Sequence, residues 1–257
     1  MGQAILSLVL GGVIGFSLGL LGGGGSILTV PVLVYVIGQD AHTATGTSLA
    51  IVGISAMIGA IAHARRGRVK AKSGLAFGFT SMIGAMPGVW VNRFLSGRML
   101  LLLFSLLMIV VGINMLRRKS AAPQPEISGI LPENEPGEKW VKLSAFGLAI
   151  GFLTGFFGVG GGFLIVPALV LGVHLPMHQA IGTSLVVITM ASFAGFLGQY
   201  RLGRVDFPIV VFFSIGGALG ALIGTQLSGK IPERLLRTAF GWFIILVACY
   251  MILRNWT

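Results

Sequence analysis

Long apolar segments separated by short polar stretches make up most of the chain. Each is close to the length of about 20 residues that a helix needs to cross a bilayer, and a helix satisfies its own backbone groups inside lipid. The pattern therefore predicts an all-α integral membrane protein. The long apolar segments are 3–21, 43–63, 73–92, 98–116, 141–157, 178–199, 207–228 and 233–253, and shorter runs lie at 26–38 and 162–173.

One polar stretch, residues 119–140, interrupts this pattern near the middle of the chain. It holds four of the seven acidic residues, all of them glutamates, and four of the ten prolines. Such a composition is typical of a solvated linker. The linker divides a single membrane domain into membrane repeat 1, residues 1–118, and membrane repeat 2, residues 141–257.

The two halves repeat each other at an offset of 136 residues, without a gap. The matches are at polar, glycine and proline positions, so apolar composition alone does not explain them. Internal duplication in so hydrophobic a chain is typical of secondary transporters, whose pathway lies between two repeats. The main matches are Gly22–Gly25 with Gly158–Gly161, Gly46-Thr47-Ser48 with Gly182-Thr183-Ser184, and the segment Arg65–Val69 with Arg201–Val205.

The number of crossings in each repeat depends on the two shorter apolar runs. A helix of about 12 residues rises only about 18 Å, less than the roughly 30 Å of hydrocarbon. We therefore favour about four transmembrane helices per repeat, with the first helical segment of each repeat broken at a Gly cluster. If the short runs also cross, each repeat has five spans and the second repeat is inverted. Both arrangements satisfy the positive-inside rule equally well.

The composition agrees with a membrane location. Hydrophobic residues make up 55% of the chain and charged residues 10%, with a mean hydropathy of +0.94, whereas soluble domains carry about 25% charged residues. The net charge of +11 comes mainly from short loops, where basic side chains orient a protein in the membrane. We expect a multi-pass protein of the cell (inner) membrane, with no nucleic-acid partner. A homodimer is left open.

Two Gly-rich clusters are the strongest candidates for a binding site. Glycines are poor helix formers, at about 1 kcal/mol each, so the helix should unwind there and expose backbone N–H groups. Exposed backbone at membrane depth is tolerated only inside protein or beside a watery cavity, and a restarting helix attracts anions. The alternative is that these glycines only permit close helix packing. The candidate residues are Gly22, Gly24, Gly25, Ser26, Gly158, Gly160, Gly161 and Gly162.

Hydroxyl and imidazole groups follow each cluster at matching positions. Thr47 and Ser48, and likewise Thr183 and Ser184, are expected near the start of the next helix, where they either donate to an anion or cap the helix. His42 and His178 lie just ahead of them. These two histidines are candidates for a proton relay, with a purely interfacial role as the alternative.

Several function classes are excluded by what the sequence lacks. No Asp or Glu falls in the middle of an apolar segment, although cation carriers and proton pumps normally place a carboxylate there. There is no Cys/His metal spacing, no P-loop and no pair of catalytic carboxylates. We therefore expect no enzyme, no catalytic residue, no metal and no cofactor. Binding by neutral donors favours a small anionic substrate.

The repeated motifs resemble those of a known family. The Gly-rich break, Pro31, the Gly46-Thr47-Ser48 motif and the Arg65–Val69 segment, each duplicated in the second half, are similar to the TauE/SafE family of sulfite exporters, also called the 4-toluene sulfonate uptake permease family. The resemblance covers nearly the whole chain except the linker. It implies an inner-membrane carrier of sulfite, organosulfonates or related anions.

These arguments lead to a prediction of secondary transport. The chain is expected to bind a small sulfur-containing anion near the membrane centre, between the two Gly-interrupted segments, and to export it by alternating access. Two alternatives stay open, namely an anion channel, which helix ends and neutral donors also build, and a membrane assembly protein without transport activity.

Overall fold

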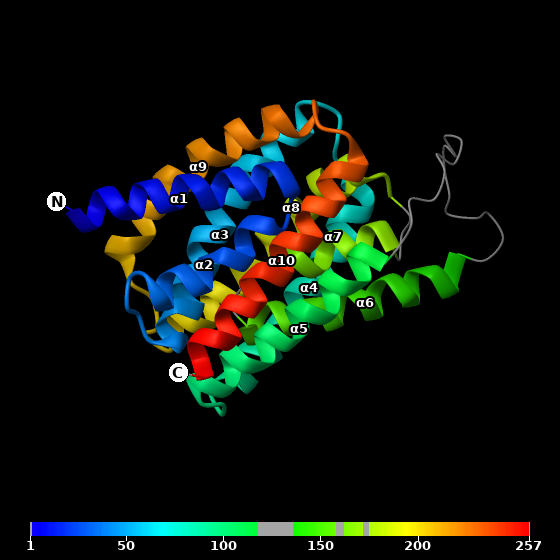
Figure 1. Ribbon diagram of the computed structural model, residues 1–257. Helices are drawn as coiled ribbons and strands as arrows, with labels where there is room; N and C mark the ends of the chain where they lie inside the picture. The colour runs from blue at the N-terminus through cyan, green and yellow to red at the C-terminus, as the bar shows by residue number, and fades with distance from the viewer. Residues whose placement is uncertain (1, 118–135, 158–161, 172–174, 257) are drawn as a thin grey trace.

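The computed structural model describes residues 2–117, 136–157, 162–171 and 175–256. All regular structure within these ranges is helical, which confirms the all-α prediction (Figure 1). The helices of the first half are α1 (Gly2–Leu21), α2 (Gly24–Tyr35), α3 (Ala41–Ala64), α4 (Ala71–Asn92) and α5 (Gly97–Arg117). Those of the second half are α6 (Pro136–Phe157), α7 (Gly162–Leu171), α8 (Met177–Arg201), α9 (Phe207–Ser228) and α10 (Glu233–Trp256).

Each long apolar segment predicted from the sequence lies within one helix. Helices at the 136-residue offset have matching bounds, most clearly α4 and α9, which both contain 22 residues. Helix α6 begins at Pro136, inside the stretch 119–140 that the sequence predicted as linker. Six of the described helices are long and apolar enough to cross a membrane, and shorter apolar stretches add to them.

Contacts between helices define their relative directions. Gly15 lies against Gly217 and Gly19 against Ala221, so α1 and α9 are parallel. Gly53 approaches Ser192, whereas Gly59, further along α3, approaches the earlier residue Leu185 of α8. The related helices α3 and α8 are therefore antiparallel.

The remaining contacts extend this inverted relation to the other helices. Gly112 of α5 lies near Ile245, and Gly241 of α10 lies near Leu116, so these two related helices are also antiparallel. Helix α2 turns back beside α1, because Gly25 packs against Ile14 and Leu18. Of the two arrangements left open by the sequence, the helix directions correspond to five helices per half with the second half inverted.

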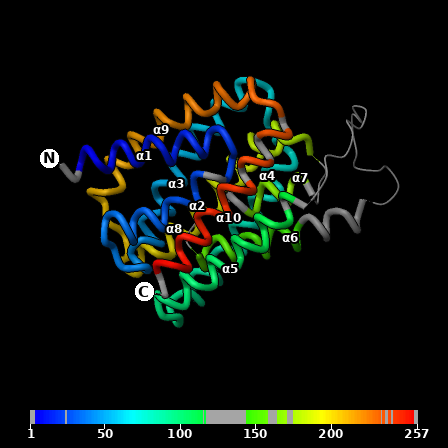
Figure 2. Tube along the Cα trace, viewed as in Figure 1, coloured from blue at the N-terminus to red at the C-terminus, as the bar shows by residue number. Residues whose placement is uncertain are grey.

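The centre of the bundle is formed by α3 and α8. About two thirds of each of these helices is buried, 67% in both cases. Helix α9 packs on α1 and α3, while α4 packs on α6 and α8, so each half is interleaved with the other. Helices α5 and α10 pair on one side (Figure 1), and the trace shows α1 beginning and α10 ending at the same end of the bundle (Figure 2).

Glycines allow the α1–α9 and α4–α6 pairs to approach at backbone distance. A Cβ atom at Gly15 or Gly19 would collide with the backbone of α9, and one at Gly220 or Gly224 would collide with the backbone of α1. Close backbone approach of this kind is how helices associate in lipid, where burial of apolar surface gives no net driving force. The interleaving of the two halves thus depends on small residues.

Candidate functional site

The first Gly cluster breaks the helix, as the sequence predicted. Helix α1 ends at Leu21 and α2 begins at Gly24. Gly22 adopts φ 75°, a left-handed conformation that side-chain-bearing residues avoid. Gly23 N–H donates to Leu21 O rather than to the carbonyl four residues back. The break leaves the carbonyl of Gly19 without its normal partner inside the helix.

This break lies against the other half of the protein. A Cβ atom at Gly22 would lie 2.8 Å from Ser184 Oγ and 3.0 Å from Ile181 Cα, so no side chain fits there. Gly25, in contrast, packs on α1 and Gly24 is the first residue of α2. The structure therefore joins Gly22 and Ser184, two of the predicted site residues, across the interface between the halves.

The second Gly cluster lies partly outside the described residues. Gly158, Gly160 and Gly161 are among the residues that are not described, and Gly162 is the first residue of α7. Helix α6 ends at Phe157, directly before this cluster.

The two threonines of the predicted site hold loops of the opposite half. Thr47 Oγ1 accepts a hydrogen bond from the backbone N–H of Asp206 at 3.1 Å, and Thr183 Oγ1 accepts one from the N–H of Lys70 at 3.0 Å. Both threonines are fully buried. They lie about two turns inside α3 and α8, and not near the helix start as predicted. The residue that caps the start of α3 is Asp40.

The serines predicted beside them bond within their own helices. Ser48 Oγ donates to Thr45 O at 2.9 Å, and Ser184 Oγ donates to Ile181 O at 2.7 Å. Ser26 Oγ donates to Gly23 O at 2.7 Å, across the break. Each hydroxyl proton is thus engaged, although the oxygen of Ser184 still faces Gly22.

A polar group of four side chains closes one end of the bundle, and we call it the Asn92 cluster. Asn92 Oδ1 accepts from Gln199 Nε2 at 3.3 Å and from Arg204 Nη1 at 3.5 Å, and it lies 3.1 Å from His42 Nδ1. Asn92 Nδ2 donates to Phe156 O at 2.7 Å, near the end of α6. The cluster therefore joins both halves near the end of α6, where the chain is interrupted between α6 and α7.

The opposite end is closed by a related group, the Ser228 cluster. His178 Nε2 donates to Ser228 O at 3.0 Å, and Arg68 Nη1 approaches Ser228 Oγ at 3.5 Å. His63 Nε2 lies 3.0 Å from the carbonyl oxygen of Gly19, the carbonyl freed by the break in α1. Each member stands 136 residues from a member of the Asn92 cluster.

The last turns of α1 and α6 therefore lie toward opposite ends of the bundle. His42 and His63 belong to the two clusters and are 21 positions apart on α3, about 30 Å of helix at about 1.5 Å per residue. The sequence had predicted that both Gly-interrupted segments would meet around one anion near the membrane centre. Inversion of the second half separates them, because related points in inverted repeats face opposite sides of the membrane.

Between the two clusters, buried serine hydroxyls lack hydrogen-bond partners. Ser55, Ser81, Ser192 and Ser214 lie near the middle of α3, α4, α8 and α9, and among the described side chains their Oγ atoms have no partner. Ser55 contacts Gly217, and Ser192 lies beside Gly53. Buried polar groups without a partner are rare, and a functional role is one explanation for them.

The start of α3 carries a fixed negative charge at the Asn92 end. Asp40 caps the helix by accepting from the N–H groups of His42 at 3.0 Å and Thr43 at 3.1 Å. Burial raises the pKa of this carboxyl, but the hydrogen bonds from Thr43 and His42 outweigh burial and hold the pKa below its usual value. Asp40 is therefore ionised at neutral pH.

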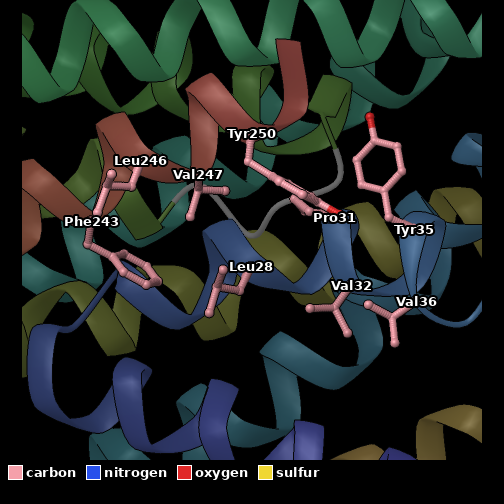
Figure 3. Close-up of a pocket in the computed structure, with 9 residues that line it drawn as sticks. All are labelled: Leu28, Pro31, Val32, Tyr35, Val36, Phe243, Leu246, Val247 and Tyr250. Carbon is pink, nitrogen blue, oxygen red and sulfur yellow. The ribbon is translucent and has the colours of Figure 1, made fainter. Parts of the chain in front are cut away.

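A separate cavity of about 320 Å³ lies between α2 and α10. Leu28, Pro31, Leu246 and other apolar side chains line it, and Tyr35 and Tyr250 stand at one end (Figure 3). It contains no basic side chain. An apolar wall of this kind does not suit an anion, so we do not assign the substrate to it.

Comparison with known proteins identifies the family. The family model of sulfite exporter TauE/SafE matches residues 7–251. The chain belongs to the TauE/SafE family. This membership and the names of its relatives indicate a multi-pass membrane transporter and not an enzyme.

Three relatives show how far the similarity to TauE/SafE proteins extends. A probable membrane transporter protein of Xylella fastidiosa (strain 9a5c) is 40% identical over 255 residues, covering 98% of this chain and 96% of the relative. The probable membrane transporter protein YdhB of Bacillus subtilis is 27% identical, covering 88% and 91%. MJ0441 of Methanocaldococcus jannaschii is also 27% identical, covering 94% of each. No solved structure matches the chain.

Sequence reasoning missed several polar residues of this TauE/SafE protein. Asn92, Gln199 and the four mid-membrane serines are buried polar groups within apolar helices. The available signal was a polar side chain in the middle or at the end of an apolar segment. Serine is common in membrane helices for packing reasons, so only the three-dimensional arrangement distinguishes these serines from ordinary small residues.

Proposed function

We propose that this protein is a secondary transporter that exports small sulfur-containing anions, sulfite or organosulfonates, across the cell (inner) membrane by alternating access. Family membership supports the substrate class and the direction. Inverted halves support alternating access. When two halves are related by inversion, an exchange of their conformations converts a state open to one side of the membrane into a state open to the other side. The two clusters would act as gates, one at each end.

The observation that carries the proposal is a set of buried serine hydroxyls, near the middle of four helices, that have no hydrogen-bond partner among the described residues. Ser55 and Ser192 come from the two halves and belong to the central helices α3 and α8. A hydroxyl donates readily to a sulfur oxyanion, and the donation would satisfy a group that is otherwise buried without a partner. We propose that the anion passes from one Gly break to the other and is held on the way by these hydroxyls.

The predicted site residues keep distinct places in this proposal. Gly22 and Ser184 would form the passage at the end of α1, and the residues of the second Gly cluster would form the corresponding passage at the end of α6. His42 and His178 would act at the two gates, where each has a hydrogen-bond partner. Thr47 and Thr183 would contribute by holding the loops that flank the passages.

Serine substitutions test the mid-membrane site. Ser55→Ala and Ser192→Ala should raise the KM for sulfite in proteoliposomes about ten-fold or more, since a hydrogen bond to a charged group contributes about 1.5–3 kcal/mol. Their thermal stability should be equal or higher, because a buried unsatisfied group is removed. Ser105→Ala is the matched control: Ser105 is buried, but its hydroxyl already donates to Leu101 O at 2.8 Å. An unchanged KM in both test variants would exclude the site.

Counterflow distinguishes a carrier from the alternatives. Vesicles loaded with unlabelled sulfite should transiently accumulate labelled sulfite, because a carrier exchanges one anion for another. A channel carries out no such exchange. If a wide panel of anions showed no flux at all, the protein would be a membrane assembly protein.

A further inference from the structure

His63 occupies an unusual position for a histidine. It lies in the last turn of α3 and its side chain is fully buried. Its Nε2 atom faces the carbonyl oxygen of Gly19 at 3.0 Å, and its Nδ1 atom is buried without any hydrogen-bond partner. It lies outside the repeated motifs of the sequence.

The contact with Gly19 fixes which ring nitrogen carries the proton. A carbonyl oxygen only accepts hydrogen bonds, so Nε2 must be the protonated nitrogen in the neutral ring. Nδ1 then holds a lone pair, and no donor in the described structure points at it. Nδ1 is therefore a base without a partner among the described residues, on a ring that contacts α1 at Gly19, just before the helix break.

The charged groups around the ring all have the same sign. Arg68 and Arg66 follow α3, and His178 lies at the start of α8; these groups act electrostatically on His63. Helix α1 contributes only the Gly19 carbonyl, and the end of α9 contributes Ser228, which binds His178 and Arg68. No carboxylate among the described residues would compensate a proton on Nδ1, so a bound anion is the group that could do so.

We propose that His63 Nδ1 binds a proton together with the transported anion at the Ser228 end of the protein. This inference rests on the proposed anion transport and adds a coupling proton to it. The anion would enter beside Gly22 and Arg68, where its charge offsets that of the protonated ring. Proton and anion therefore bind cooperatively, each raising the affinity of the other by the same factor.

The related position in the other half carries no ionisable side chain. Gln199 stands 136 residues after His63 and is equally buried. An amide does not take up a proton near neutral pH, so anion binding at the Asn92 end does not involve a proton at this position. The proton of this proposal is therefore bound at His63, at the Ser228 end, and not at Gln199.

The experiment measures proton uptake and affinity on the full chain in detergent. The probe is methanesulfonate, which stays ionised between about pH 5 and 8, so that only the protein titrates in this range. Adding methanesulfonate to wild-type protein in weak buffer should draw up to one proton per chain from solution. The dissociation constant should rise up to ten-fold per pH unit on the alkaline side. His63→Gln, which copies the residue of the other half, should bind without proton uptake and with little pH dependence.

Ser105→Ala, at a buried serine outside both clusters, serves as the control and should retain the proton uptake of the wild type. Binding by the wild type that is independent of pH would overturn the role of His63 while leaving anion transport intact. Proton uptake by His63→Gln equal to that of the wild type would overturn it as well. A complete failure of wild-type protein to bind sulfite or methanesulfonate would overturn both this inference and the proposed function.

Discussion

At the scale of single residues, the structure divides the polar groups into those with a partner and those without one. Thr47 and Thr183 already accept hydrogen bonds from backbone N–H groups, whereas Ser55, Ser192 and the Nδ1 atom of His63 have no partner within the described part of the chain. The sequence showed which polar residues were repeated in the two halves. It did not show which of them were already satisfied, because their partners lie more than 100 positions away.

Replacement of the two threonines tests this division. Thr47→Val removes the acceptor of the Asp206 N–H and Thr183→Val that of the Lys70 N–H. Each change leaves a part-buried donor unpaired at a cost of about 1–3 kcal/mol. We expect a lower melting temperature in detergent for both variants, with the KM for sulfite within about two-fold of the wild type. A large rise in KM without loss of stability would show instead that these hydroxyls contact the anion.

At the scale of helices, the sequence was most informative. Apolar length alone placed every long helix, and the glycine run between 22 and 25 marked a real break. It did not show which glycines meet a neighbouring backbone, because that depends on the rotation of each helix. Gly12 and Gly15 are similar in sequence context and both lie beside α9. A Cβ atom at Gly15 would collide with the backbone of Gly217, whereas one at Gly12 would be 3.9 Å from Gly216 O.

This contrast within one helix gives a prediction about stability. Gly15→Ala should force α1 and α9 apart and destabilise the protein by about 1–3 kcal/mol, as overpacking does. Gly12→Ala has room for its methyl group and should be neutral or stabilising by up to about 1 kcal/mol, since alanine is the better helix former. Melting curves of the two variants, recorded in the same detergent, provide the comparison. Equal destabilisation of both would mean that α1 and α9 do not pack as described.

At the scale of the whole molecule, the inversion of the two halves was beyond the reach of the sequence. The short helix α2 has 12 residues, and its length argued against a crossing. Its direction follows only from contacts such as those of Gly25 with α1. The positive-inside rule could not choose between the arrangements, because both place the same share of the basic residues on the cytoplasmic side of the membrane. Consequently the sequence predicted one central meeting point for the breaks, whereas the fold places one toward each end.

The inversion can be tested with single cysteines at related positions. Arg65 and Arg201 are both exposed and 136 residues apart. Arg65 directly follows α3 and Arg201 is the last residue of α8, and these two helices run in opposite directions. In a Cys249→Ser background, Arg201→Cys should react with a membrane-impermeant maleimide in intact cells, because the more basic end, with Arg65, Arg66 and Arg68, belongs inside. Arg65→Cys should react only after the cells are opened. Labelling of both positions from the same side would show that the halves are parallel. The two gates would then have to lie at one end of the bundle. Alternating access between inverted halves does not allow that arrangement.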